Sequence, residues 1–320
     1  MNSRQRQGGA ALLLAMMVVV LVVTTAAGMV WLQTRAVHVE AAERARSQAG
    51  WILVGATDWA RLLLREDLRS GRQNGRNFDS LDEPWATRLE EARLSSFLAA
   101  DKDNNADSGP EAFISGAISD AQSRYNLRSL IDASGKVVPP QVAALRRLVE
   151  QAGAPAGTAD RIAEALAHST ATAATPATSD APLKPAQLGD LAWLGVTPDT
   201  IERLRPWVDL LPIATPVNVN TAPREVLVAA IDGLDLGTAE RLVQARQRQP
   251  FESLEQVQAL LTPEVRVDAS RLSVGSSWFY VAGRLRLEDR AVEERSLVQR
   301  EGDRVVVRRR ERLSLGGEPR

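Results

Sequence analysis

The chain has 320 residues, of which 44% are hydrophobic and 25% charged, a composition typical of a folded protein with two or three domains. The 39 lysines and arginines nearly balance the 40 aspartates and glutamates, so a formal net charge of -1 provides no overall basic field for nucleic acid. Cysteine is absent, which excludes disulfides, thiolate nucleophiles and cysteine-ligated metal centres. The two histidines, His38 and His168, are too far apart in the sequence for metal-ligand spacing.

The N-terminal region is far more apolar than the average composition suggests. No ionisable side chain occurs between Arg6 and Arg35, and residues 10–32 form an unbroken apolar run. Because a hydrocarbon core needs about 20 apolar residues, this run predicts one membrane-spanning helix. Arg4 and Arg6 precede the run, so we expect a cytoplasmic N-terminus. A cleaved secretory signal, a plain signal anchor and a short polar leader that ends in Gly9 are the three interpretations.

The helical pattern continues beyond the apolar run. Residues 33–68 contain no proline, and their apolar residues recur mostly three, four or seven positions apart, at Val37, Ala41, Ala45, Ile52, Ala56, Trp59 and Leu63. We therefore expect one helix over residues 10–68, on the order of 90 Å long, which we call the spine helix. Its second half would pack on a globular head through Trp51, Trp59 and the run Leu62-Leu63-Leu64.

After a turn-rich break at residues 69–77, the pattern changes from strands to helices and back to strands. Alternating apolar and charged residues predict antiparallel strands at Trp278–Leu287, Glu294–Gln299 and Arg304–Leu313. Since an isolated pair of short strands is marginally stable, we expect these strands to complete a sheet begun near residues 79–118. The predicted fold class is α+β, with a long N-terminal transmembrane and spine helix and an antiparallel sheet interrupted by a large all-α insertion.

The predicted boundaries follow these changes of pattern. They are a leader (1–9), the spine helix (10–68, transmembrane over 10–32), the first part of the sheet domain (69–120), the helical insertion (121–272) and the C-terminal strands (273–316). Within the insertion we expect two subdomains, about 121–168 and 186–262, joined by an Ala-, Thr-, Ser- and Pro-rich linker at 169–185. In the second subdomain the expected helix caps are Asn220 or Thr221, Thr238, and Ser253 with Gln256.

Five short segments occur in a diagnostic order. They are Gly9 directly before AALLLAMM, Asp82-Glu83-Pro84-Trp85-Ala86, the NLxxL segment Asn126 to Leu130, LPxxTPVNVNTAPxEVL from Leu211 to Leu227, and Trp278-Phe279-Tyr280 before an arginine-rich end. In order and spacing they resemble the K-type minor pseudopilins of type II secretion systems, the general secretion pathway protein K family.

The resemblance implies how the N-terminus is processed. In the family, a prepilin peptidase cuts after the glycine on the cytoplasmic side and the new N-terminus is methylated, which assigns cleavage to Gly9 and methylation to Ala10. The fifth mature residue would be Leu14. Most pseudopilins have a glutamate there that pairs with the N-terminal amine of a neighbouring subunit, and the K component characteristically lacks it.

The resemblance also implies the architecture, location and partners. The sheet would be pilin-like, the insertion SAM-like or helix-hairpin-helix-like, and the head would lie in the periplasm beside the inner membrane. The protein would form the tip of the pseudopilus with the I and J pseudopilins and help to initiate assembly for export of folded proteins. Other partners would be the major pseudopilin, the inner-membrane secretion platform and the prepilin peptidase, with no nucleic acid and no enzymatic activity.

The main alternative is a membrane-anchored, competence-type protein that binds DNA through a helix-hairpin-helix. In that motif a Gly-hydrophobic-Gly hairpin presents backbone N–H groups to a phosphate. Residues 233–237 read Gly-Leu-Asp-Leu-Gly, which is two residues longer and has Asp235 where phosphate would approach. We therefore expect the hairpin to serve packing, and Asn218 and Asn220 to cap turns rather than read bases.

Catalytic and metal motifs are sparse. There is no nucleophile elbow, phosphate-binding glycine loop or His-Glu constellation. A secreted hydrolase, processed by signal peptidase near Ala27, is the remaining alternative.

One polar loop has oxygen-bearing side chains at alternate positions, as in the first half of a calcium loop: Asp101, Asp103, Asn105 and Asp107. Ala106 stands where an EF-hand has glycine, and Ala112 where it has the last glutamate. A solvated loop that binds no metal is therefore the alternative. The resemblance favours calcium because K-type pseudopilins bind it, but it does not identify these four residues as the ligands.

Overall fold

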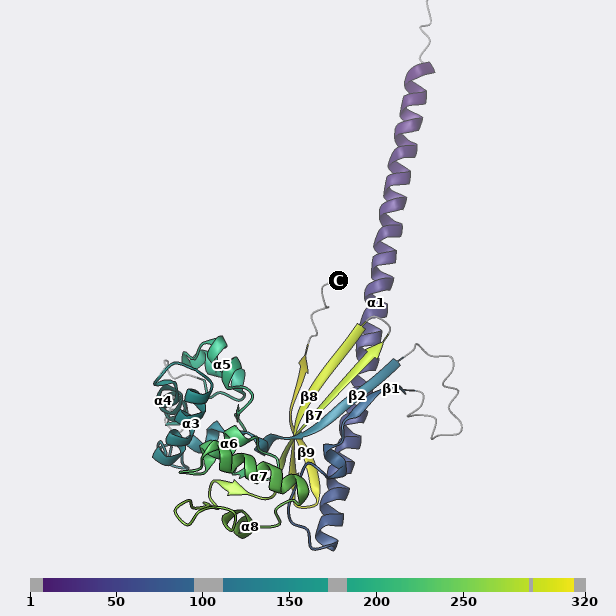
Figure 1. Cartoon of the computed structure of the whole chain (residues 1–320). Coiled ribbons are helices and arrows are strands. Elements are labelled where there is room, and N and C mark those ends of the chain that lie inside the picture. Colours follow the sequence, from purple (N-terminus) through teal and green to yellow (C-terminus); the bar gives the residue numbers. More distant parts are fainter. Residues whose placement is uncertain (1–7, 95–111, 172–182, 288–289, 314–320) are drawn as a thin grey trace, which may run out of the picture.

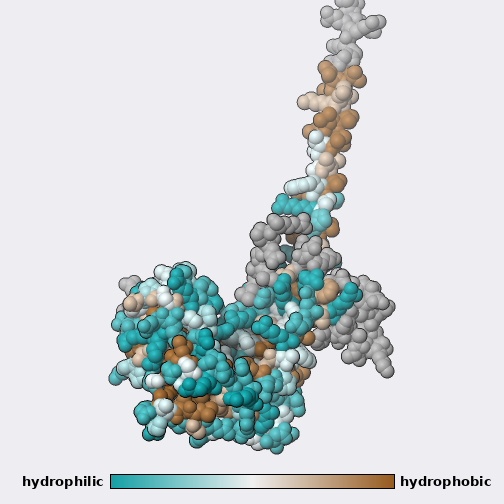
Figure 2. Space-filling model, in the orientation of Figure 1, coloured by the Kyte–Doolittle hydropathy of each residue, from teal (hydrophilic) through white to brown (hydrophobic). Residues whose placement is uncertain are grey.

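A single long helix dominates the computed structural model, which describes residues 8–94, 112–171, 183–287 and 290–313. Helix α1 (Gly8–Gln73) has 66 residues, so it is about 100 Å long. All side chains from Ala11 to Ala41 are exposed, and the most apolar window of the helix has a mean hydropathy of 2.5. The helix is therefore long and apolar enough to cross a membrane, and its apolar half projects from the rest of the molecule (Figures 1 and 2).

The helix ends later than predicted. Residues 69–73, which we assigned to a turn-rich break, form its last turn, and the chain turns at Gly75, where φ is +72°. Their polar side chains are compatible with helix because this end of α1 faces solvent, and Arg72 pairs with Asp303 at 2.6 Å. The polar side chains of residues 69–73 therefore indicate a solvent-exposed turn of the helix, not the end of the helix.

One five-stranded antiparallel sheet joins the two ends of the head. Its order is β1-β2-β7-β8-β9, and its strands are β1 (Leu89–Arg93), β2 (Ala112–Asp120), β7 (Trp278–Leu287), β8 (Arg290–Glu301) and β9 (Arg304–Leu313). Strands β2 and β7 are neighbours, with Asp120 opposite Phe279. The C-terminal strands thus complete a sheet begun before the insertion, which confirms the predicted α+β fold class.

The second half of α1 packs on one face of this sheet. Its buried side chains follow a helical spacing of four, four, three and four: Ala49, Leu53, Thr57, Ala60 and Leu64. Two apolar clusters form there, one around Leu53 and Leu285 and one around Leu64, Trp85 and Phe279. Gly283 permits close approach, because a Cβ atom there would lie 3.1 Å from Leu53 Cδ2.

The predicted packing face of α1 was partly wrong. Leu64 is fully buried, as expected, but Trp51 is 75% exposed, Trp59 52% and Leu62 51%. The sheet selects the neighbouring stripe of the helix, which is rich in small residues such as Ala49 and Ala60, because small side chains let the two backbones approach. Large aromatic residues on α1 therefore lie on the face away from the sheet.

The insertion between β2 and β7 is predominantly helical and lies near the C-terminal end of α1 (Figure 1). Its α-helices are α3 (Pro139–Gln151), α4 (Thr158–Ala171), α5 (Pro198–Leu204), α6 (Arg224–Ala230), α7 (Leu236–Arg248) and α8 (Leu254–Gln258). In the described ranges the 3-10 helices are η1 (Pro84–Ala86) before the sheet, and η3 (Ala121–Ser123), η4 (Leu127–Leu130) and η5 (Leu188–Leu194) in the insertion. Two parallel pairs of two-residue strands complete the insertion: β3 (Tyr125–Asn126) with β4 (Val208–Asp209), and β5 (Val217–Asn218) with β6 (Leu272–Ser273).

The insertion has one continuous hydrophobic core. This core extends from Tyr125 to Leu272 and includes residues of both predicted subdomains, so the two halves pack together rather than separately. Helix α4 continues to Ala171, into the stretch predicted as a linker at 169–185, and residues 172–182 lie outside the described part of the chain.

The predicted helix caps were largely wrong. Helix α6 has Pro223 rather than Asn220 or Thr221 at its N-cap, and α7 is capped by Asp235, whose side chain accepts from Thr238 N at 2.9 Å. Ser253 is the N-cap of α8 but makes no capping hydrogen bond with its side chain, and Gln256 instead accepts from Glu252 N. Tertiary contacts of the asparagines explain the first error, as described below.

Candidate functional site

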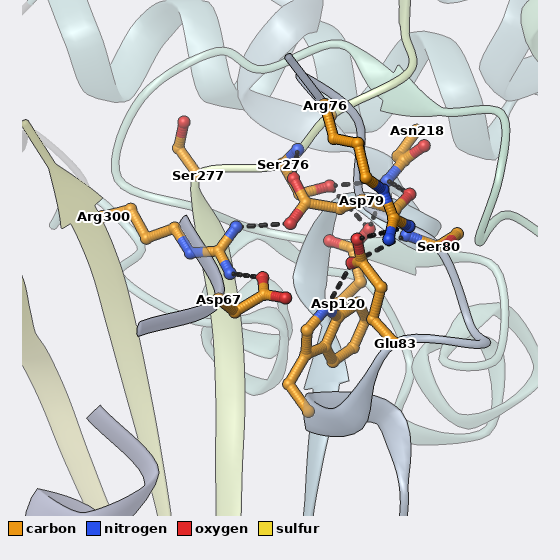
Figure 3. Close-up of polar contacts among 12 residues, drawn as sticks. Asp67, Arg76, Asp79, Ser80, Glu83, Asp120, Asn218, Ser276, Ser277 and Arg300 are labelled. Atoms are coloured by element: carbon orange, nitrogen blue, oxygen red, sulfur yellow. Dashed lines mark hydrogen bonds and ion pairs between the residues drawn. The ribbon is translucent and has the colours of Figure 1, made fainter. Parts of the chain in front are cut away.

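A network of buried polar side chains connects α1, the sheet and the insertion where α1 ends (Figure 3). We call it the buried polar junction. Its members come from six separate parts of the sequence and are Asp67, Asp79, Ser80, Glu83, Asp120, Asn218, Thr221, Ser276 and Arg300. Because the three structural parts of the head meet here, the junction fixes how the insertion is held relative to the spine helix.

Arg300 of β8 is the cation of the junction. Its guanidinium donates to Asp67 of α1 at 2.6 Å and also to Asp79, and its side chain is only 5% exposed. The group lies over the Phe279 ring, 4.5 Å from the ring centroid. A buried arginine with two buried carboxylates ties the end of α1 to the sheet, and loss of either kind of partner would leave an uncompensated charge.

Ser276 links Asp79 to Asp120. Its backbone N–H donates to Asp79 at 2.7 Å, and its hydroxyl donates to Asp120 at 2.6 Å. Asp120 also accepts from Thr221 Oγ1 at 2.6 Å and from Asn218 Nδ2 at 3.0 Å. Among the described residues no cation contacts Asp120, and burial raises the pKa of its carboxyl to about 6, against the lowering effect of these hydrogen bonds.

The Asp-Glu-Pro-Trp-Ala motif builds the neighbouring part of the junction. Pro84 begins η1, and this turn places Trp85 in the core, edge-on to Phe279 with ring centroids 5.1 Å apart. Glu83 accepts from Trp85 Nε1 at 2.7 Å and from Ser80 N at 3.2 Å. Burial raises the pKa of Glu83 to about 7. The motif is thus a structural turn in which Glu83 accepts the hydrogen bond of the buried Trp85 indole N–H.

The asparagine motifs are also structural. Asn218 is fully buried, and besides Asp120 its amide donates to Asp79 O at 3.1 Å. Asn220 is 2% exposed; its side chain donates to Phe251 O and accepts from Phe251 N, both at 2.9 Å. Asn126 accepts from Leu211 N at 3.1 Å. These contacts confirm that Asn218 and Asn220 bind backbone and are not available to read bases.

The hairpin between α6 and α7 has its own carboxylate at the helix N-terminus. Asp235 accepts the Thr238 N–H and, at 2.6 Å, the Thr238 hydroxyl. Asp232 pairs with Arg147 at 2.6 Å and with Arg271 at 2.7 Å. A phosphate approaching this hairpin would meet two carboxylates, which opposes the binding mode that the motif serves in DNA-binding proteins.

Three carboxylates of the junction lie close enough to hold a metal ion. Ligand atoms of Asp67, Asp79 and Glu83 all lie within 4.8 Å of one another. Arg300 pairs with the first two, and Arg76 lies 3.4 Å from Glu83 Oε1, so the protein supplies the counter-charges itself. The predicted calcium ligands Asp101, Asp103, Asn105 and Asp107 lie outside the described residues.

For the predicted processing site, Gly9 and Ala10, the structure describes only the backbone conformation. Gly9 and Ala10 belong to the first turn of α1, which continues without interruption into the apolar run. Leu14, the expected fifth mature residue, is 68% exposed on the same helix. Cleavage at Gly9 and methylation of Ala10 stay predictions.

The exposed side of α1 continues the apolar surface toward the head. Trp51, Gly55, Trp59 and Leu62 are spaced four, four and three apart, so they share one face of the helix, and all four are exposed. Nothing lies within 4 Å of a Cβ atom built on Gly55. The face consists of two large rings flanking a glycine gap, a shape suited to another helix.

Comparison with known proteins agrees with the sequence motifs. Models of type II secretion system protein K match residues 123–213 and 217–275. The type II secretion system protein K of Pseudomonas aeruginosa is 30% identical over 311 residues, which cover 92% of this chain and 89% of that protein. This chain belongs to the type II secretion system protein K family. The protein K of Pectobacterium carotovorum is 35% identical over 125 residues, 37% of this chain and 38% of that protein.

A solved structure of the protein K family shares the fold. A chain from the crystal structure of the GspK-GspI-GspJ complex of the enterotoxigenic Escherichia coli Type 2 Secretion System superposes with a TM-score of 0.61 and 20% identity. The match covers 85% of this chain and 98% of that chain. The protein K family consists of structural components of a secretion system, and the single apolar N-terminal helix is consistent with membrane anchoring.

Proposed function

We propose that this protein is a minor pseudopilin that forms the tip of a periplasmic pseudopilus with I- and J-type pseudopilins and helps to initiate its assembly. The observation that supports this most is the asymmetry of α1. Its first half is apolar and exposed, whereas its second half is buried on one side against the sheet and exposed on the other. Such a helix can be stored in a bilayer and later packed among the helices of neighbouring subunits.

The insertion supports an end position. It lies at the end of the head opposite the membrane-spanning half of α1, where a further subunit would stack (Figure 1). Leu14 fits the same position, because a subunit with nothing above it has no neighbouring amine to engage. The I and J partners are those of the GspK protein in the solved complex. The major pseudopilin, the secretion platform and the prepilin peptidase would be further partners.

In this proposal the protein is inserted once in the inner membrane, with its N-terminus cytoplasmic and its head periplasmic. The prepilin peptidase would remove residues 1–9, and Ala10 would be methylated. Calcium would be bound through Asp101, Asp103, Asn105 and Asp107. The mechanism is assembly rather than turnover, and no catalytic step is assigned to any residue.

Immunogold labelling of pseudopili tests the tip position. Antibodies against the insertion should label one end of each pseudopilus when pseudopili are overproduced together with this protein. Antibodies against the major pseudopilin, as the control, should label along the whole length. Insertion-specific labelling along the length would contradict the tip position.

The DNA-binding alternative has a separate test. The full-length protein in an uncharged detergent should not shift duplex DNA at low salt, because Asp232 and Asp235 occupy the hairpin where phosphate would bind. A shift that disappears as salt rises, and that is lost when Arg241 and Arg246 are replaced, would instead support DNA binding.

A further inference from the structure

A polar cleft separates the insertion from the face of the sheet opposite α1. On β7, Phe279 and Leu285 contact the α1 side, so strand alternation places Tyr280 and Ala282 on the other side, where they line the cleft. The cleft has a volume of about 360 Å³. Two arginines from the insertion and two from the sheet line it: Arg124, Arg205, Arg295 and Arg309. Its lining carboxylates are Asp209 and Glu311, so four positive groups against two negative groups leave an excess of two positive charges.

Three of the four arginines already have carboxylate partners. The pairs are Arg124 with Asp209 at 3.6 Å, Arg309 with Glu311 at 2.5 Å, and Arg205 with Glu202, outside the lining, at 2.6 Å. Arg309 also donates to Ala186 O at 2.5 Å, which joins the β9 edge to the start of η5. Each ion pair therefore stays within one wall of the cleft, and hydrogen bonds join the walls, from Arg309 to Ala186 O and from Tyr280 to Asp209.

Arg295 differs from the other three. Its guanidinium carbon lies 3.6 Å from the centroid of the Tyr280 ring, and within the described residues it makes no hydrogen bond or ion pair. Tyr280 is itself fixed, since it is 3% exposed and its hydroxyl donates to Asp209 at 3.0 Å. A guanidinium stacked on an aromatic ring keeps its N–H groups in the ring-parallel plane, where they can bind a carboxylate in bidentate fashion. Arg295 is thus a positioned cation that forms no ion pair within the described part of the chain, with Glu311, which pairs with Arg309, opposite it in the β8–β9 register.

We propose that this cleft binds an acidic segment of a polypeptide, with one carboxylate held by Arg295. The volume exceeds that of a single small anion, and the four arginines come from both the insertion and the sheet, as do the carboxylates of Asp209 and Glu311. That pattern suits several separate single charges better than one concentrated dianion, which the resident carboxylates would repel. The insertion would then act as a receptor surface for an acidic partner, whether or not the protein occupies the tip.

Binding of a defined peptide tests the proposal. The probe is a fluorescein-labelled hexapeptide that alternates glutamate and serine, titrated by fluorescence anisotropy against the full-length protein in an uncharged detergent at low salt. We expect saturable binding with a Kd below about 1 mM, and at least tenfold weaker binding of the same peptide with glutamine in place of glutamate. Arg295→Gln should weaken binding about tenfold, because it removes the free guanidinium.

Two controls keep the test specific. Arg284→Gln removes an exposed arginine that lies on the same face of β7 but outside the cleft, and it should change the Kd less than about twofold. Unchanged thermal unfolding midpoints for both variants would exclude misfolding. Inorganic phosphate should compete only at concentrations about tenfold above those of unlabelled acidic peptide.

Four results would overturn the proposal. They are no saturable binding, equal binding of the glutamine peptide, equal effects of Arg295→Gln and Arg284→Gln, and stronger competition by phosphate than by peptide. The last result would assign the cleft to a small anion. None of these measurements depends on pseudopilus assembly, so failure here would leave the tip proposal standing.

Discussion

At the scale of single residues, Arg300 organises the junction between the spine helix and the insertion. It is the buried cation that two carboxylates from separate segments share, and its nearest sequence neighbours give no hint of either partner. The sequence predicted a structural rather than a base-reading role for Asn218 and Asn220, but not Asp67, Asp79, Asp120 or Arg300 as a group. These four residues are brought together only by the fold.

Replacement of Arg300 should be strongly destabilising. Arg300→Ala leaves Asp67 and Asp79 buried without their cation, so we expect the free energy of unfolding to fall by about 3–5 kcal/mol. Chemical denaturation of the full-length protein in detergent measures the change. Arg284→Ala, at an exposed position of β7, is the matched control and should cost less than about 0.5 kcal/mol. Equal effects of the two substitutions would contradict a structural role of the junction.

Asp120 should make stability depend on pH. Burial raises the pKa of this carboxyl from 3.8 to about 6, so between about pH 4 and pH 6 the folded state binds more protons than the unfolded state. The free energy of unfolding should therefore fall as pH rises through this window, by up to about 3 kcal/mol from this residue. Asp120→Asn should flatten that slope in denaturation series at pH 4, 5 and 6. A variant whose slope matches the parent would show that Asp120 is ionised in the folded state throughout.

At the scale of elements, strands were easier to predict than helix faces. Strands β7 and β9 coincide with the predicted segments, because each alternates apolar and charged residues on a sheet with one more exposed face. The buried face of α1 was misassigned at Trp51 and Trp59, since several helical stripes are apolar and only the sheet decides which one is covered. The caps at Asn220 and Thr238 were misassigned because these side chains had other partners, Phe251 and Asp235.

Two neighbouring leucines of α1 should behave oppositely. Leu64 is fully buried between α1 and the sheet, so Leu64→Ala should lower the free energy of unfolding by about 2–5 kcal/mol. Leu62 is 51% exposed on the opposite face, so Leu62→Ala should change stability by less than about 1 kcal/mol.

Two exposed residues of α1, Leu62 and Trp51, separate an effect on assembly from an effect on stability. If the exposed face packs on other spine helices, then Leu62→Ala combined with Trp51→Ala should reduce co-purification with I- and J-type pseudopilins while the unfolding midpoint stays near that of the parent. Full retention of both partners by this double variant would argue against that face as an interface.

At the scale of the whole molecule, buried contacts join three parts with different roles. The apolar half of α1 is long and apolar enough to cross a membrane, the other half packs on the sheet, and one hydrophobic core unites the insertion. The order of these parts was predictable from sequence, since hydropathy, alternation and family motifs all change where the structure changes. The single core of the insertion was not, because the Ala- and Thr-rich stretch between its halves suggested separation.

The proposed function requires that this helix belongs to a pseudopilin rather than to a signal anchor or a secreted protein. Mass spectrometry of the N-terminal peptide, from protein purified out of cells that contain the secretion system and its prepilin peptidase, tests it most directly. We predict a mature N-terminus at Ala10, with one methyl group on its amine, and no peptide that retains residues 1–9. A mature N-terminus near Gly28, or an intact leader, would contradict the claim.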